Sequence, residues 1–281
     1  MKILYSIEEL TQPLEKLRIQ NKTVGFVPTM GALHTGHLSL VKLALQKTPL
    51  VVVSIFVNPT QFNDKEDLNK YPKNISEDLS LLQTVLRKTD IVFIPSTHEM
   101  YPEPDMRAFN FGKLDKVLEG AHRPGHFNGV AQIVSKLFNL VQPDFAFFGE
   151  KDLQQLIIVR KLSESLHLPV TIVGGKIIRE PDGLAMSSRN QLLEEKERAE
   201  APKIYQALKK AIVLSNSYTP KEVKAQTVEW IEQNSDLSIE YFEIVDEENL
   251  LPVKNWGTSK NIYGCIAVKA GKIRLIDNIK F

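Results

Sequence analysis

Hydrophobic and polar positions follow two alternating periods over the first 177 residues of the chain. Short runs rich in β-branched or aromatic residues, each bounded by polar residues, predict buried strands. Apolar residues recur at helical spacing between most of these runs, and Ser6 with Glu9 forms a capping-box pattern that opens the first helix. The predicted strands are 23–27, 50–57, 91–94, 145–148 and 170–173, and the predicted helices are 6–19, 38–46, 75–86, 130–141 and 153–166.

This order of elements predicts an α/β fold, with a Rossmann-like parallel sheet covered by helices on both faces. In such sheets, ligands bind beyond the carboxyl ends of the strands, near the point where the strand order reverses. We therefore expect the chemistry to lie in segments that directly follow strands. Segment 62–73 is polar and lacks a clear period, which predicts a mobile loop.

The pattern changes after residue 177. A charged, alanine-rich stretch at 192–213 predicts a helix, and a second helix is expected to begin at Thr219, with Pro next and Glu at the third position. Runs at 237–245, 262–268 and 273–276 predict antiparallel strands, and a glycine-bearing turn joins the last two. We expect residues 1–177 to form the Rossmann-like domain and residues 178–281 to form a smaller α+β domain.

Composition narrows the class of protein. The 281 residues are 43% hydrophobic and 25% charged, which is typical of a folded globular chain. The chain has 35 basic and 34 acidic residues, which gives a net charge of +1. No global field therefore draws the chain to nucleic acid or to an anionic membrane. The longest apolar run, 50–57, is far shorter than a membrane helix, and Glu8 and Glu9 lie where a signal peptide would be apolar. We expect a cytoplasmic protein, with its one cysteine, Cys265, as an inert core thiol.

The first chemical motif is His34-Thr-Gly-His37, at the predicted start of a helix. Gly31 and Gly36 allow the backbone to approach a ligand closely, and free N–H groups at a helix start attract phosphate. The two histidines lie one turn apart and can donate to phosphate oxygens as charge builds in a transition state. A zinc site at this pair would lack a third ligand nearby. The remaining histidines, expected to be structural, are His98, His122, His126 and His167.

Two further segments carry polar groups near strand ends. Gly149 permits a turn, Lys151 offers a positive charge to phosphate, and Asp152 serves either as a helix cap or as a ligand acceptor. Gln155 follows early in the next helix, where a solvated face is the alternative reading. Segment 186–189, Met-Ser-Ser-Arg, could close over a polyphosphate, although a linker would have a similar composition.

Taken together, these segments resemble the pantoate–β-alanine ligase family, also called pantothenate synthetases. The family belongs to the nucleotidyltransferase superfamily, which includes class I aminoacyl-tRNA synthetases and is marked by an HxGH-type motif. The matching segments follow the family's order between residues 24 and 190, whereas the chain from residue 192 onward matches only in length and helical texture. They are 27–37, 56–62, 71–72 with 77–78, 118–130, 148–152 and 179–190.

The resemblance implies an activity on the coenzyme A pathway. The enzyme would ligate (R)-pantoate and β-alanine to give pantothenate, AMP and diphosphate, through a pantoyl-adenylate intermediate. ATP would be a substrate with Mg²⁺ on its phosphates, the C-terminal domain would act as a lid, and the protein would be a homodimer. Two alternatives stay open: another adenylyl or cytidylyl transferase of the superfamily, which would leave the nucleotide on its product, and a nucleotide-sensing or RNA-binding module that kept the fold.

The resemblance also assigns residues. Glu77 stands where many members have Asp, so the metal ligands are left open, and Arg123 is a second candidate near the phosphates or the dimer partner. The catalytic set is His37, His34, Lys151 and Arg189. The ATP-binding set is Met30, Gly31, Ala32, Leu33, His34, Thr35, Gly36, His37, Gly149, Glu150, Lys151, Asp152, Ile178, Met186, Ser187, Ser188 and Arg189. The set for pantoate and β-alanine is Gln61, Gln155 and Asn58.

Overall fold

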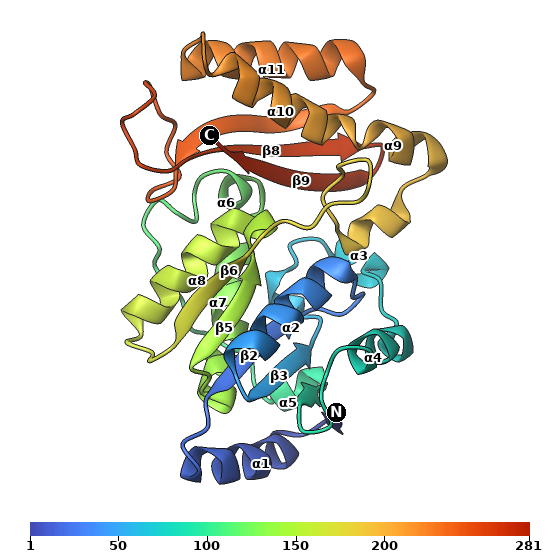
Figure 1. Ribbon diagram of the computed structural model, residues 1–281, viewed down its shortest axis with the longest axis vertical. Coiled ribbons are helices and arrows are strands. Elements are labelled where there is room, and N and C mark those ends of the chain that lie inside the picture. The colour runs from blue at the N-terminus through green and yellow to red at the C-terminus, as the bar shows by residue number, and fades with distance from the viewer.

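The computed structural model describes the backbone of residues 1–281 and all side chains except those of Leu17 and Lys65. Six parallel strands form the larger sheet in the order β1-β4-β3-β2-β5-β6, and β7, β8 and β9 form a separate antiparallel sheet (Figure 1). The strands are β1 Lys2–Leu4, β2 Val24–Thr29, β3 Leu50–Ile55, β4 Ile91–Phe93, β5 Phe145–Gly149, β6 Thr171–Gly175, β7 Ser238–Asp246, β8 Ile262–Ala270 and β9 Ile273–Lys280. The α-helices are α1 Ile7–Ile19, α2 Thr35–Lys47, α3 Lys65–Lys70, α4 Ile75–Gln83, α5 Thr97–Met100, α6 Glu119–His122, α7 His126–Val141, α8 Leu153–Ser165, α9 Glu195–Glu200, α10 Lys203–Leu214 and α11 Pro220–Asn234, and the 3₁₀ turns are η1 Pro59–Gln61, η2 Glu150–Asp152 and η3 Ser188–Leu192.

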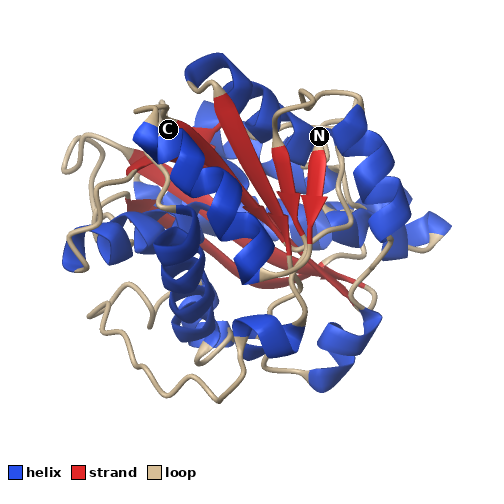
Figure 2. Cartoon of the chain, turned by 90° about the horizontal axis from the view of Figure 1, so that it is seen from below, coloured by secondary structure: helices blue, strands red, loops and turns tan.

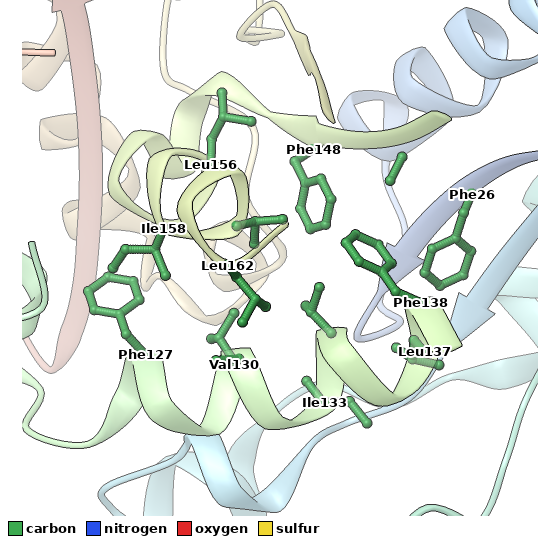
Figure 3. Close-up of a cluster of buried hydrophobic side chains, with 14 of the residues drawn as sticks. Phe26, Phe127, Val130, Ile133, Leu137, Phe138, Phe148, Leu156, Ile158 and Leu162 are labelled. Atoms are coloured by element: carbon green, nitrogen blue, oxygen red, sulfur yellow. The ribbon is translucent and has the colours of Figure 1, made fainter. Parts of the chain in front are cut away.

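Helices cover both faces of the larger sheet, and successive side chains of a strand point to opposite faces, so neighbours in sequence belong to different cores. Phe26 of β2 belongs to the core formed with α1, α7 and α8, where it packs edge-on against Phe138 with the ring centroids 6.3 Å apart (Figure 3). The next residue, Val27, belongs to the core under α2 and α4. The helices enclose the strands in Figure 2. These observations confirm the predicted α/β fold with a parallel sheet.

The strand order reverses at β2. From β2 the chain builds β3 and then β4 on one side, whereas β5 and β6 are added on the other side. The carboxyl ends of β2 and β5 therefore flank the crevice in which parallel α/β sheets bind ligands.

The small sheet has its own core against α10 and α11, built around residues such as Phe242, Leu208 and Ile231. Its other side adjoins the first unit, because Val245 and Cys265 belong to the core of α7 and α8. The structure thus has the second, smaller α+β unit that the sequence predicts. The predicted boundary between residues 177 and 178 falls in the connection after β6 and stays a prediction.

Two local predictions need correction, and one strand was not predicted. The single helix expected at 192–213 is wrong: α9 and α10 are separate, because Pro202, which has a fixed φ and no N–H, stands at the start of α10. Segment 62–73 contains the short helix α3, whose first turn is capped by the Asp64 carboxylate accepting the Glu66 N–H at 2.7 Å. Strand β1, which pairs with β4, was not predicted, because its three residues are too few to show a period.

Candidate active site

A cavity lies at the carboxyl ends of β2 and β5, between the larger sheet and β9. It brings together residues from all the chemical segments found in the sequence, which lie as much as 159 positions apart, from Met30 to Arg189. The predicted site residues in its lining are Met30, His34, Gly36, His37, Asn58, Gln61, Gly149, Lys151, Asp152, Gln155, Ile178, Met186, Ser187, Ser188 and Arg189.

The two histidines of the first motif are fixed by main-chain N–H groups at the start of α2. His34 is the N-cap residue, and its Nδ1 accepts the Gly36 N–H at 3.1 Å. A Cβ on Gly36 would lie 2.8 Å from the His34 ring, so only glycine allows this folded-back position. His37 Nδ1 accepts the His34 N–H at 3.3 Å. Because each Nδ1 is an acceptor, each ring carries its proton on Nε2 when it is neutral.

Burial sets the charge of these rings. It lowers the pKa of His34 to about 4, and it lowers the pKa of His37 to about 3, with the neighbouring His34 as the second cause. Both rings are therefore neutral near pH 7 and offer an Nε2–H donor. The positive charge of the cavity comes instead from its basic lining residues, which are Arg123, Lys151, Lys176 and Arg189.

The turn between β2 and α2 is held from outside the cavity. The buried Asp78 carboxylate accepts the N–H of Ala32 at 3.0 Å and that of Leu33 at 2.6 Å. Ala32 has a φ of +49°, a conformation that an alanine keeps only when its surroundings fix it. Residues 31–33, although predicted to bind ATP, lie outside the lining and shape this turn. Asp78 was not predicted as a site residue, because its task depends on a contact 45 residues away in sequence.

Thr35 and Glu150 also lie outside the cavity lining. The Thr35 hydroxyl donates to the sulfur of Met186, which ties the start of α2 to segment 186–189. The Glu150 side chain lies against Gly174 of the neighbouring strand β6. A Cβ added to Gly174 would lie 3.1 Å from the Glu150 carboxylate. The side chains of these two predicted ATP-binding residues therefore contact other segments of the protein and do not line the cavity.

Lys151 reaches the cavity from a turn that β9 holds. The lysine is mostly buried, and its Nζ lies 3.6 Å from the Asp152 carboxylate. The side-chain amide of Asn278 donates to the main-chain carbonyl of Glu150 at 2.8 Å and to that of Lys151 at 2.9 Å. Asn278 itself lines the cavity and was missed in the sequence. The sequence feature that could have indicated Asn278 is the polar pair Asp277-Asn278 within an otherwise apolar strand. It was missed because the predicted strand ended at residue 276, whereas β9 continues to Lys280.

Asn58 and Gln61 lie together in the wall formed by η1, but in different ways. Asn58 is 1% exposed, and its amide nitrogen donates to Gln61 Oε1 at 3.2 Å and to the Gly129 carbonyl at 3.0 Å. Its Oδ1 accepts the hydroxyls of Tyr101 at 2.9 Å and Thr60 at 3.1 Å. All four hydrogen-bonding positions of the Asn58 amide are thus used within the protein. The arrangement orients Gln61 and leaves Asn58 no free group for a ligand.

Helix α7 approaches η1 very closely. A Cβ on Gly129 of this helix would lie 2.3 Å from the carbonyl oxygen of Thr60, so the contact requires glycine. One turn earlier, His126 Nδ1 lies 2.8 Å from the Gln61 carbonyl oxygen and therefore donates to it. The other ring nitrogen accepts from the Arg123 guanidinium at 3.3 Å. His126, expected to be structural, thus lines the cavity and holds Arg123 there.

Segment 186–189 closes one side of the cavity. The Arg189 guanidinium donates to both carboxylate oxygens of Asp67 on α3, at 3.0 and 3.2 Å. The Tyr71 hydroxyl lies 3.3 Å from the buried Ser188 hydroxyl. Tyr71, from the segment predicted as a polar loop, therefore lines the cavity, and Asp67 of the same segment binds Arg189.

The described side chains include no group of three or more His, Cys, Asp or Glu that could hold a metal ion. Glu77, the doubtful metal ligand, is exposed and lies outside the cavity lining. Cys265 is buried in the wall of the cavity, and burial raises the pKa of its thiol to about 12, as expected for a core cysteine. Among the helices of the structure, none combines the length and apolar character needed to cross a membrane.

A family model described as pantoate-beta-alanine ligase matches residues 2–280. The chain belongs to the pantoate–β-alanine ligase family. A pantothenate synthetase from Bacteroides thetaiotaomicron is 52% identical over 281 residues, which cover 100% of this chain and 99% of that protein. A pantothenate synthetase from Thermosipho africanus is 46% identical over 280 residues and covers 99% of both chains. Membership thus extends over the C-terminal region, where the sequence motifs alone were uninformative.

Solved structures of this ligase family share the fold. Pantothenate synthetase from Thermus thermophilus superposes with a TM-score of 0.93 at 41% identity, over 99% of both chains. Pantoate–β-alanine ligase from Francisella tularensis, complexed with β,γ-ATP and β-alanine, superposes with a TM-score of 0.83 at 33% identity, over 99% of this chain and 97% of that one. The expected family and fold are confirmed.

Proposed function

We propose that this member of the pantoate–β-alanine ligase family joins (R)-pantoate to β-alanine, with ATP cleaved to AMP and diphosphate. The observation that carries the proposal is the meeting of His34, His37 and Lys151 with Gln61 and Gln155 in one cavity at the strand-order reversal. Groups suited to a polyphosphate and groups suited to a small hydroxy acid thereby share a single site. Family membership supports the same reaction.

We propose that the ATP phosphates bind at the start of α2. The positive end of the helix dipole attracts anions, and His34 and His37 donate from Nε2 without carrying a charge. Lys151 supplies the point charge, and Arg189 exchanges its Asp67 partner for phosphate oxygens. Ile178 and Met186 hold the base; the Met186 N–H donates to the Ile178 carbonyl at 3.0 Å, so these two residues form one surface.

Gln61 and Gln155 are proposed to hold pantoate beside the α-phosphate, with Gln61 also near β-alanine. Asn58 acts through Gln61, whose Oε1 it binds. The pantoate carboxylate attacks the α-phosphorus in line, the bond from that phosphorus to the oxygen shared with the β-phosphate breaks, and diphosphate leaves. The amine of β-alanine then attacks the carboxyl carbon of pantoyl adenylate and loses a proton, and AMP leaves with the bonding electrons. No enzyme nucleophile is needed, so catalysis consists of positioning and charge stabilisation.

Mg²⁺ is proposed to accompany ATP as a counter-ion of the phosphates. Mg²⁺ commonly keeps several waters and is bound through substrate phosphates with one or two carboxylates. The described residues fit this mode better than a protein cage, since no three-ligand group is present among them and Asp152 is a half-exposed carboxylate beside Lys151. The chain's own part is to neutralise the phosphates through Lys151 and Arg189.

We further propose that residues 1–177 bind ATP and pantoate, that residues 178–281 act as a lid, and that the protein is a cytoplasmic homodimer. The lining supports the first two parts, because segment 186–189 and β9 cover the cavity from the C-terminal side. Light scattering coupled to gel filtration tests the dimer: a mass near 64 kDa is expected, about twice the 31.8 kDa chain. Cell fractionation tests the compartment.

The decisive experiment measures AMP release from ATP, Mg²⁺, pantoate and β-alanine, with each component omitted in turn. AMP should form only when all are present, whereas exchange of labelled diphosphate into ATP should need pantoate but not β-alanine. An adenylyl or cytidylyl transferase would instead leave the nucleotide on its product. Exchange without pantoate, or no exchange under any condition, would refute the proposed reaction.

A further inference from the structure

We infer that Asn278 is a positioning residue for Lys151: it links the last strand of the C-terminal sheet to the phosphate-binding turn. Its side-chain amide donates to the main-chain carbonyls of two successive residues, Glu150 at 2.8 Å and Lys151 at 2.9 Å. The amide orientation is set by these partners, because both are acceptors and only the nitrogen can face them. Asn278 is 4% exposed, so its amide forms these two hydrogen bonds away from bulk water.

Several contacts hold the backbone around Asn278. Its neighbour in β9, Asp277, binds the Arg179 guanidinium through both carboxylate oxygens, at 2.6 and 3.0 Å. Asp277 Oδ1 also accepts the Asn278 N–H at 2.8 Å. Asn278 lies opposite Cys265 in the β8–β9 ladder, and Arg179 stacks over the Tyr205 ring at 3.7 Å. The segment that enters the C-terminal unit and its last strand are thus tied together directly behind the Lys151 turn.

The turn itself is weakly held by its own residues. In η2 and at the start of α8, neither Gly149 nor Asp152 supplies a side-chain cap to the helical N–H groups. The side chain of Lys151 has a flexible four-carbon stem, so the location of its ammonium group depends on where the backbone turn is placed. The donor that fixes this turn comes from a residue 127 positions later in the chain. The small sheet therefore sets the position of the phosphate-binding lysine in addition to covering the cavity.

The test is the variant Asn278→Asp, which keeps the shape and turns a donor into a carboxylate facing two carbonyls. The inference rests on the proposed role of Lys151 toward ATP. We expect pantoate-dependent ATP–diphosphate exchange to fall by about 10- to 100-fold, the loss expected when a catalytic group is displaced by about 1 Å. The KM for pantoate should change less than about twofold, because Gln61 and Gln155 are held by other elements. Asn278→Ala, which adds no charge, should show a smaller loss in the same direction.

A double-mutant cycle separates positioning from general damage. In a Lys151→Ala background, Asn278→Asp should cause no further loss of exchange, because the group it positions is gone. Losses that multiply in the double variant would overturn the inference, as would normal exchange in Asn278→Asp beside an impaired Lys151→Ala enzyme. Normal exchange in Lys151→Ala alone would instead refute the proposed role of Lys151.

A matched control tests whether any contact across the two units has the same effect. Arg160 of α8 lies 3.5 Å from Glu247, which follows β7, and neither residue lines the active-site cavity. Arg160→Met removes this contact and should leave exchange and the KM for ATP unchanged. Should Arg160→Met lower exchange as much as Asn278→Asp, the effect would belong to the packing of the units in general, and the specific role of Asn278 would be rejected.

Discussion

The imidazole rings of His34 and His37 lie 4.2 Å apart, and the N–H of the first residue donates to the Nδ1 of the second. Both rings are neutral at pH 7 because burial lowers the pKa of each. A neutral pair costs less to bury beside Lys151 than two imidazolium ions would, and it still presents two directed donors. The site therefore separates the supply of charge, by lysine and arginine, from the supply of oriented hydrogen bonds, by the histidines.

The first prediction concerns the donor at His37. His37→Ala should lower pantoate-dependent ATP–diphosphate exchange by about 10²–10³-fold, because one preorganised donor to the transition state is lost. Exposed His98 on α5 provides a control, since His98→Ala removes an imidazole outside the cavity lining and should keep wild-type exchange. Near wild-type exchange in His37→Ala would contradict the role given to this residue.

The second prediction concerns pantoate. Gln155 lines the cavity from the first turn of α8. Among the described residues, none forms a hydrogen bond with its side-chain amide. Gln155→Ala should weaken pantoate binding by roughly 5- to 100-fold, which corresponds to about 1–3 kcal/mol for hydrogen bonds lost in a closed site. Isothermal calorimetry measures the affinity, with the exposed substitution Gln233→Ala on α11 as the control. An unchanged pantoate affinity would show that Gln155 does not hold this substrate.

The third prediction concerns the ion pair between Arg189 and Asp67. If ATP recruits Arg189, Asp67 competes with the phosphates for the guanidinium. Asp67→Asn should therefore strengthen ATP binding by about two- to fivefold, since a partly exposed ion pair contributes less than about 1 kcal/mol. Glu66→Gln on the same helix breaks the exposed pair with Lys70 and should leave ATP affinity unchanged. Weaker ATP binding in Asp67→Asn would mean that Asp67 preorganises Arg189 instead of competing for it.

The fourth prediction concerns pH and stability. Burial lowers the pKa of His126 to about 4, below the ordinary value near 6.5, so the unfolded chain binds a proton between these values that the folded protein does not. Stability must therefore fall as the pH drops through this window, by about 2 kcal/mol at pH 5 for this one residue. His126→Asn, which keeps a donor for the Gln61 carbonyl, should lose less stability between pH 7 and pH 5 in urea unfolding. An equal loss in both proteins would exclude His126 as a source of the acid sensitivity.

Much of the fold followed from local pattern. The strands around Phe26 and Phe147 were predicted because each is a short run of β-branched or aromatic residues bounded by polar ones, and the helix after His37 was predicted because its apolar residues recur at helical spacing. The helix starting at Thr219 was predicted for a similar reason, because its capping box satisfies the first N–H groups within four residues. Such signals act over one or two turns of chain, so the sequence carries them in full. The short strand β1 and the break at Pro202 were missed, since the first has too few residues for a period and the second lies inside one charged run.

By itself, the sequence determined most of the longer elements, the family, and the types of group that meet in the site: His34 and His37 at a helix start, Lys151 after a strand. Only the tertiary structure decided how those groups are held. Asn58 uses all its hydrogen bonds within the protein, Asp78 fixes a turn from 45 positions away, and Asn278 holds the Lys151 turn from 127 positions away. The physical reason is that a hydrogen bond between distant segments depends on the packing of whole elements against one another, and no local period records which buried polar groups that packing will pair.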